Sequence, residues 1–378
     1  MFLIERLIGV GVYMSILLVA CWFLSFTMAK TRSVLIWYLV ALCVMAAFYK
    51  PYETGDLYRT YILMDFFRTM SFVEFWSGYA IVSSAPAARL LFWIIAKTEM
   101  FSLLPVISSF ICYSLIFRTV CKAQRCFSIS NETIATVLFF VMSASIYISV
   151  IGGIRMMLAF SLLMFSFYRG AAEKKMNLMD LLISSIAILM HATAIVVFVM
   201  CAITLIFASH QKPFRKALAT IFVIALGTAF IVAFPSTVLE LFEKASGYIF
   251  GDQYSDKWEY IMGFLIILLL FLILCEYRKL DQSDKVAVLK PFNVITVLCM
   301  LVSVVLFFEF SIFYRFGAHF AVLFAIPTMM VTLEKTKGKP SAIFKRIDVR
   351  SVMVVFCVFI ALLSCARGSL SSLKFFEL

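Results

Sequence analysis

The sequence predicts an all-α, polytopic integral membrane protein, and three observations agree on this. Hydrophobic residues make up 64% of the 378 residues and charged residues only 14%, whereas about half of a soluble domain is apolar. Apolar runs of about 20 residues, the length that crosses a bilayer, recur from end to end. Only short polar links separate most of these runs. We therefore expect a single transmembrane domain over residues 1–378.

The apolar runs predict about twelve transmembrane helices. In order, they lie near residues 7–29, 33–49, 100–120, 132–151, 155–170, 177–190, 192–209, 217–238, 259–277, 291–309, 316–333 and 349–366. The first run is interpreted as a full span because it lacks a small-residue cleavage site and a second span follows at once. The apolar stretch from Leu178 to Ala208 is too long for one helix and short for two, so we expect a break near His191.

The charged links predict which side each loop faces. The formal net charge of +12 would suggest a nucleic-acid partner in a soluble protein, but the excess lies in short loops between spans, so no nucleic acid is expected. By the positive-inside rule these loops are cytoplasmic. They hold Lys30 and Arg32; Lys122 and Arg125; Lys174 and Lys175; Lys212, Arg215 and Lys216; Arg278, Lys279 and Lys285; and Lys335, Lys337, Lys339, Lys345 and Arg346.

This alternation holds only if residues 79–97 do not cross completely. The segment contains Pro86 and Arg89 and is broken by Ser83 and Ser84, which is typical of a surface or re-entrant helix. Both termini are then outside. Two long outer loops are predicted, residues 50–98 with interfacial helices and residues 240–258 with many aromatic rings. The rings fit the aromatic belt of a membrane interface better than a platform for sugars. Polar residues from distant parts of the chain converge on this outer face: Asp56, Arg59, Arg68, Arg89, Arg155, His191 and Arg315.

The stretch S-V-I-G-G-I-R-M-M-L-A, residues 149–159, carries the first functional hypothesis. An arginine at membrane depth is expensive unless it faces protein, water or an anion. Gly152 and Gly153 are predicted to end one helix, so that the next begins at Ile154 with its first N–H groups and its dipole available to an anion. In the alternative, the glycines form a hinge or a close-packing point and Arg155 reaches a lipid headgroup.

Three further residues are candidates, each with a structural alternative. Asp56, in G-D-L-Y-R-T-Y, is either a general base or a helix N-cap. His191 is either a base or a core histidine bonded to a backbone carbonyl. Arg315 either binds an anion or pairs with Glu309, which precedes it by one and a half turns. His319 lies one turn after Arg315 on the same helix face, so the two residues could share a site.

The chemistry that these residues support is anion binding next to a base. Guanidinium groups bind phosphate in a fixed planar fork, so two of them can hold a diphosphate and stabilise it as it leaves. The sequence contains no nucleotide-binding loop, metal-ligand cluster or nucleophile elbow, so no cofactor and no soluble nucleotide donor are predicted. Cys121 and Cys126, the only close cysteine pair, have no histidine nearby and are interpreted as ordinary thiols.

Four short motifs, in their order along the chain, resemble those of the EpsG family of bacterial polysaccharide polymerases, the Wzy-type enzymes of O-antigen, capsule and exopolysaccharide assembly. They are Gly55, Asp56 and Tyr61 in the first outer loop, G-I-R-x-x-L-A from Gly153 to Ala159, H-A-T-A from His191 to Ala194, and Y-R-F from Tyr314 to Phe316. One departure concerns the central arginine. The family usually has Asn three residues before it and Gln directly after it, where this chain has Gly152 and Met156.

The resemblance implies a GT-C-like architecture with its active site on the periplasmic or exterior side of the bacterial inner membrane. It implies a metal-independent, inverting transfer of the growing glycan from undecaprenyl diphosphate to the non-reducing end of an incoming lipid-linked repeat unit, in the assembly of lipopolysaccharide, capsule or related polymers. The implied partners are the undecaprenyl-diphosphate-linked oligosaccharide donor and acceptor, the bilayer, a chain-length regulator and a flippase. On this basis Arg155, Arg315, Arg59 and Arg89 bind diphosphate, Asp56 or His191 orients or deprotonates the acceptor, and Gly152, Gly153, His319, Glu309 and Tyr314 support the site.

Three other functions fit the sequence less well. A membrane O-acyltransferase also uses an intramembrane histidine, but usually with further polar residues nearby, whereas A-T-A-I-V-V follows His191. A lipid-linked glycan flippase would show inverted repeats or cations along both halves of a path, whereas these arginines gather on one side. An O-antigen ligase normally has a large outer loop late in the chain, where the loops here are short.

Overall fold

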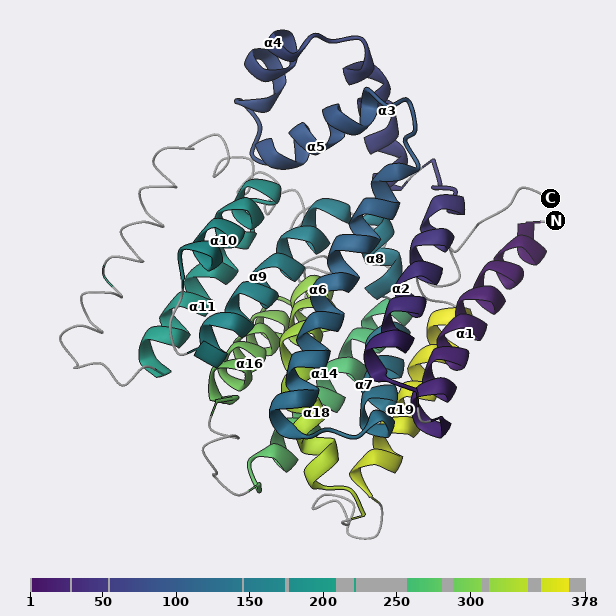
Figure 1. Ribbon diagram of the computed structural model, residues 1–378, viewed down its shortest axis with the longest axis vertical. Helices are drawn as coiled ribbons and strands as arrows, with labels where there is room; N and C mark the ends of the chain where they lie inside the picture. Colours follow the sequence, from purple (N-terminus) through teal and green to yellow (C-terminus); the bar gives the residue numbers. More distant parts are fainter. Residues whose placement is uncertain are drawn as a thin grey trace. The chain divides into compact units, whose positions relative to one another are not determined.

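Helices make up the regular elements in the part of the chain that the computed structural model describes (Figure 1). That part comprises residues 2–27, 29–53, 55–144, 146–173, 177–208, 221, 257–280, 288–307, 313–338 and 348–366. The elements are α1 (Phe2–Phe26), α2 (Thr31–Phe48), α3 (Asp56–Arg68), α4 (Phe72–Phe75), the π-helix η1 (Trp76–Ala80), α5 (Pro86–Ala96), α6 (Leu103–Phe127), α7 (Asn131–Ser143), α8 (Ile146–Gly152), α9 (Ile154–Glu173), α10 (Leu178–Met190), α11 (Ala194–Ala208), α14 (Lys257–Tyr277), α16 (Lys290–Val305), the π-helix η2 (Arg315–Phe320), α18 (Ala321–Lys335) and α19 (Val349–Ala366). The all-α prediction is confirmed for these residues.

Several of these helices are long and apolar enough to cross a membrane, as expected of a multi-pass membrane protein. Within the described residues these spans are Ile8–Phe26, Thr31–Phe48, Leu103–Phe127, Tyr260–Tyr277 and Arg315–Lys335, and the bent pair α7 and α8 would together make another. Shorter apolar helices include α5, α10, α11, α16 and α19. The number of about twelve spans stays a prediction. The expected span at 217–238 lies outside the described residues apart from residue 221, and of the expected loop at 240–258 only the last two residues are described.

Local signals explain where the short helices begin and end. Helix α5 starts with Pro86 at its first position, and its 11 residues extend only about 16 Å. A hydrocarbon core is about 30 Å thick, so α5 cannot cross it alone. This agrees with the prediction that residues 79–97 do not span the membrane. The predicted break at His191 is confirmed, because α10 ends at Met190 and α11 begins at Ala194.

Contacts between Cα atoms divide the chain into two compact units, each of which we describe by itself. Unit 1 comprises Met1–Lys50, Ser109–Ser149 and Tyr254–Leu378, and unit 2 comprises Pro51–Ser108 and Val150–Gln253. The expectation of one domain over residues 1–378 stays a prediction.

Helix α18 lies in the core of unit 1. It packs against α7, α14 and α16, and its residues from Ala321 to Leu333 are all buried. Two buried tyrosines of this unit donate their hydroxyl groups to backbone carbonyls of other helices. Tyr13 donates to Met142 over 2.9 Å, and Tyr147 donates to Leu42 over 3.1 Å. Such bonds are needed where no water reaches the polar group. All ten cysteines are free thiols, including Cys121 and Cys126, for which the sequence predicted this.

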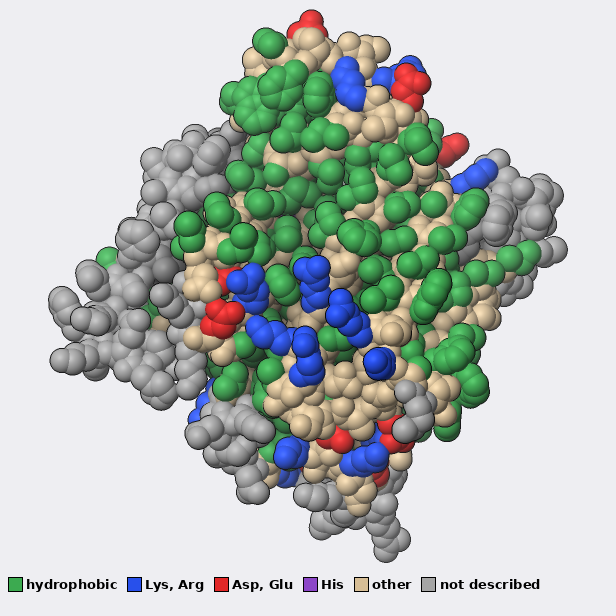
Figure 2. All heavy atoms as spheres, in the orientation of Figure 1, with side chains coloured by type: hydrophobic (Ala, Val, Ile, Leu, Met, Phe, Trp, Pro, Cys, Tyr) green, Lys and Arg blue, Asp and Glu red, His purple; other side chains and the backbone are tan. Residues whose placement is uncertain are grey.

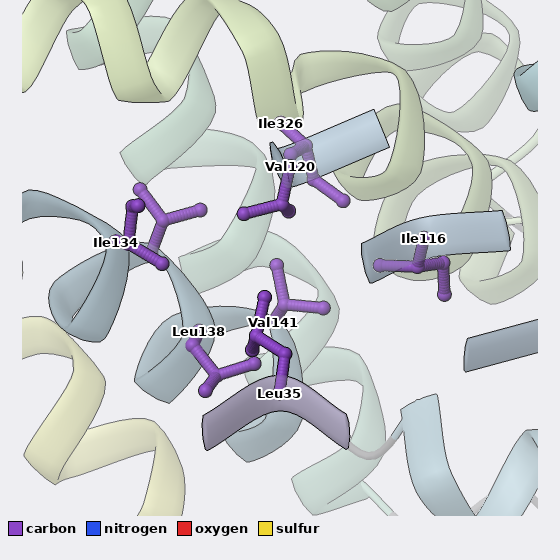
Figure 3. A pocket seen from close by; sticks show the side chains of 8 residues that line it. Leu35, Ile116, Val120, Ile134, Leu138, Val141 and Ile326 are labelled. Atoms are coloured by element: carbon purple, nitrogen blue, oxygen red, sulfur yellow. The ribbon is translucent and has the colours of Figure 1, made fainter. Parts of the chain in front are cut away.

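An apolar pocket lies inside unit 1 (Figure 3). Its lining comes from α2, α6, α7 and α18, namely Leu35, Ile116, Val120, Ile134, Val137, Leu138, Val141 and Ile326. These side chains carry no donor, acceptor or charge, so they cannot orient a sugar or a diphosphate. We therefore place no glycan site in this pocket.

Three of the basic links meet at one end of unit 1. Glu132, at the start of α7, pairs at 2.7 Å with both Lys337 and Arg350. The Asn131 side chain accepts a hydrogen bond from Thr31 over 2.6 Å. These bonds connect the α1–α2, α6–α7 and α18–α19 links. Because the positive-inside rule assigns all three to the cytoplasm, their meeting at one end agrees with the predicted topology.

In unit 2 the first outer loop forms a segment of short helices, α3 to α5. Helix α5 packs against both α3 and α10, and the segment lies beyond one end of α9 and α10 (Figure 1). Phe75 is buried and stacks on Trp93 with 5.5 Å between ring centroids. Hydrophobic side chains also gather on the outside of α4 (Figure 2), where Val73 is 73% exposed. An exposed apolar face of this kind supports an interfacial position.

Asp65→Cys and Arg125→Cys, placed singly in a cysteine-free background, should label on opposite sides of the membrane. Both positions are exposed, Asp65 on the α3 segment and Arg125 in the last turn of α6. Only Asp65→Cys should react with an impermeant thiol reagent applied from outside. Labelling of Arg125→Cys from outside would reverse the predicted topology.

Candidate functional site

The predicted break before Arg155 is present. Helix α8 ends at Gly152 and α9 begins at Ile154. The first bond of the new helix runs from the N–H of Met157 to the carbonyl of Gly153 over 3.1 Å. A methyl group added at Gly152 would meet no atom of the described residues within 4 Å, so the structure does not support the alternative that this glycine is needed for close packing. The pair of glycines instead ends one helix where the next begins.

Arg155 occupies the first turn of α9 and is exposed. Among the residues that the structure describes, none forms an ion pair or hydrogen bond with its side chain. The first N–H groups of a helix have no intrahelical partner, and the helix dipole favours negative charge there. The guanidinium and the helix start together make a place where an anion can bind.

His191 caps the end of α10 and lies beside α9 in unit 2. Its Nδ1 is 2.7 Å from the Thr193 hydroxyl, and its ring meets Phe160 edge to face at 6.2 Å. The alternative of a core histidine bonded to a backbone carbonyl stays open beside this contact. Phe160 follows Arg155 by about 7.5 Å along α9 and about 140° around it. The structure thus brings His191 close to the beginning of α9, but on a different face from Arg155.

Asp56 lies one residue further into α3 than the N-cap alternative requires. The N-cap is Gly55, and Asp56 is the first helical residue. Its carboxylate is 3.9 Å from Arg59, with side chains that are 68% and 71% exposed. Ion pairs with such exposure contribute little to stability. Asp56 and Arg59 are therefore held less firmly than His191.

Arg89 packs the outer segment together. Its guanidinium lies 5.8 Å from the centre of the Phe67 ring, which connects α5 to α3. A cation over an aromatic face is a stabilising contact. The structure thus gives Arg89 a packing role, and its binding of diphosphate stays a prediction.

Arg315 begins the π-helix η2 in unit 1, not an α-helix as the sequence suggested. Its side chain is half-buried. His319, four residues later, is buried, and its Nε2 shares a hydrogen bond with the Ser149 hydroxyl. The Tyr314 ring meets the His319 ring edge to face at 4.9 Å. Glu309 lies outside the described residues. Because Arg155 belongs to unit 2 and Arg315 to unit 1, a shared diphosphate site stays a prediction.

The comparison with known families decides the identity. A model of the EpsG family matches residues 86–372. The chain belongs to the EpsG family. It is accordingly a polysaccharide-polymerase-like membrane protein. Arg155, His191 and Arg315 lie within the matched region of this EpsG-family protein, whereas Asp56 precedes it. No curated protein and no solved structure matches the chain.

Sequence reasoning missed two partners in this EpsG-family protein. Ser149 and Thr193 were quoted only as parts of their motifs, yet each contacts a candidate histidine. A polar residue within an apolar run was the available signal for Ser149. Thr193 follows His191 by two residues, which is close enough for a local hydrogen bond.

Arg169, on the same helix as Arg155, offers a structural contrast. It forms a 3.2 Å ion pair with Asp180, whose side chain is fully buried. Arg169→Ala should lower the free energy of unfolding by about 3–5 kcal/mol, because it leaves a buried carboxylate without its partner. Thermal unfolding in detergent measures this loss. An unchanged melting temperature would show that Asp180 does not depend on Arg169.

Proposed function

We propose that this EpsG-family protein is a Wzy-type polymerase of the bacterial inner membrane. It transfers a growing glycan from undecaprenyl diphosphate to the non-reducing end of an incoming lipid-linked repeat unit, at the periplasmic or exterior face. The observation that carries this proposal is Arg155. In a chain of this family, an exposed arginine without a described partner lies in the first turn of a helix, directly after a break between apolar helices.

In this reaction the acceptor hydroxyl attacks the anomeric carbon of the donor glycan. The new C–O bond forms as the bond between that carbon and the lipid diphosphate breaks, and attack from the opposite side inverts the configuration. The hydroxyl proton passes to a base, and the diphosphate leaves with the electron pair. Arg155 and Arg315 are proposed to bind the diphosphate, because negative charge grows on it as the bond breaks.

His191 is the better candidate for the base. Its ring is oriented by Thr193 and Phe160, and it lies beside α9, which carries Arg155 in its first turn. A base must be held in position to accept a proton efficiently. Asp56 is mostly exposed and its neighbour is Arg59, so the structure supports it less.

The experiment is reconstitution of the purified protein in liposomes with a radiolabelled undecaprenyl-diphosphate-linked repeat unit. The proposal expects a ladder of longer lipid-linked glycans and one released undecaprenyl diphosphate for each new glycosidic bond. Acyl transfer to the glycan would favour an O-acyltransferase instead. Movement of the substrate across the bilayer without a new bond would favour a flippase, and transfer only to a different acceptor would favour a ligase.

A further inference from the structure

The π-helix η2 sets the position of Arg315. Its wider turn is closed by a hydrogen bond from the N–H of Ala321 to the carbonyl of Phe316, five residues earlier. Turns of this type are rare and occur often at functional sites. Arg315 is the first residue of η2. A π-turn holds one residue more than an α-helical turn, so a change from π to α would rotate Arg315 about the helix axis.

Two contacts within unit 1 hold the first half of η2. A Cβ atom at Gly317 would lie 2.6 Å from the Ser303 hydroxyl and 2.8 Å from Cδ1 of Ile267, so this residue lies flush against α16 and α14. The Ser303 hydroxyl also donates to the carbonyl of Phe313 over 2.5 Å. The start of the turn is therefore fixed by close packing and by one buried hydrogen bond.

The end of η2 is held by a polar contact with a distant helix. His319 is 2% exposed, and its Nε2 shares a hydrogen bond with the hydroxyl of Ser149, 170 residues away in the sequence. Its Nδ1 is buried without a hydrogen-bond partner among the described residues. Among the described residues, the bond to Ser149 is therefore the one hydrogen bond that the His319 ring makes. Its loss would leave both ring nitrogens buried without a partner, which is energetically costly.

We propose that Ser149 is a positioning residue for Arg315. Its hydrogen bond with His319 keeps the last part of η2 in the π conformation, and so keeps the guanidinium directed at the leaving diphosphate. This inference rests on the proposed polymerase function. Without the bond, relaxation of η2 to an α-helix removes the extra residue and turns Arg315 by about 100° relative to α18.

Four variants test the hydrogen bond. Ser149→Ala removes the hydroxyl. His319→Asn places an amide only where Nδ1 lies, whereas His319→Gln reaches the position of Nε2 and can keep the bond. Ser109→Ala is the matched control, because Ser109 is a buried serine whose hydroxyl has no hydrogen-bond partner among the described residues.

In the polymerisation assay, Ser149→Ala and His319→Asn should lower kcat by about ten- to a hundredfold with little change in the KM for the acceptor, since even a misplacement of about 1 Å can cost about a hundredfold. His319→Gln and Ser109→Ala should stay close to the wild-type rate. A wild-type rate from Ser149→Ala would overturn the inference. Equal losses in His319→Gln and His319→Asn would also overturn it, because the ring would then matter for packing alone.

A double mutant separates positioning from general damage. In an Arg315→Lys background there is no planar fork to direct, so adding Ser149→Ala should change kcat by less than about twofold. A full additional loss would show that Ser149 acts independently of Arg315. If the wild-type protein itself makes no polymer, the proposed function fails. If it does and Ser149→Ala equals it, only the positioning role fails.

Discussion

His191→Ala is expected to lower the turnover of lipid-linked repeat units by about 10²- to 10⁴-fold, with binding of the donor retained. A general base of this kind acts on the proton of the acceptor hydroxyl and does not contact the diphosphate. Thr193 and Phe160 hold the imidazole beside the first turns of α9, so its removal takes away an oriented group. The measurement combines single-turnover rates with binding of labelled donor to the same preparation.

Two companion variants sharpen this test. Thr193→Val keeps the shape of the side chain but removes the partner of Nδ1, and it should cause a smaller loss of rate than His191→Ala. Full activity in His191→Ala would move the role of base to Asp56, which Asp56→Asn then tests. If both variants remain active, the diphosphate is a good enough leaving group for the transfer to proceed without a general base.

Arg155→Ala and Arg315→Ala are each expected to lower the rate at saturating donor by about 10²- to 10³-fold. A donor group aimed at charge that develops in the transition state stabilises that state more than the ground state. Arg155→Lys and Arg315→Lys keep the charge but lose the planar fork, so their rates should fall by about tenfold or more. Protein yield and melting temperature should not change.

Arg169→Lys is the matched control for these variants. Arg169 lies on α9 as Arg155 does, but its partner is the buried carboxylate of Asp180. Its replacement should therefore change the melting temperature more than the rate. Wild-type rates from both Arg155→Lys and Arg315→Lys would reassign these two arginines to structural roles.

Local signals in the sequence predicted the breaks in the helices well. Two adjacent glycines fixed the end of α8 and the beginning of α9, and an apolar run of awkward length placed a turn at His191. The short helix α5 followed from Pro86 and the serines before it. Each of these features depends on residues that are neighbours in the chain, which is why pattern alone reveals them.

Features that depend on tertiary packing were not predicted. Gly317 of the π-helix η2 packs closely against Ser303 and Ile267, and no periodicity in the sequence predicts this wider turn. The bond between Ser149 and His319 joins residues from distant helices. The N-cap of α3, which was the structural alternative for Asp56, is Gly55.

The central claim is that arginine side chains, without a metal ion, stabilise the diphosphate as it leaves. It is tested most directly by following polymer formation by the purified wild-type protein from a lipid-linked repeat unit in the presence of EDTA. Two guanidinium groups neutralise the diphosphate in this account, so Mg²⁺ has no role to fill. The account predicts the same polymer ladder and rate with and without EDTA. Loss of polymer on chelation, restored by Mg²⁺ or Mn²⁺, would contradict it.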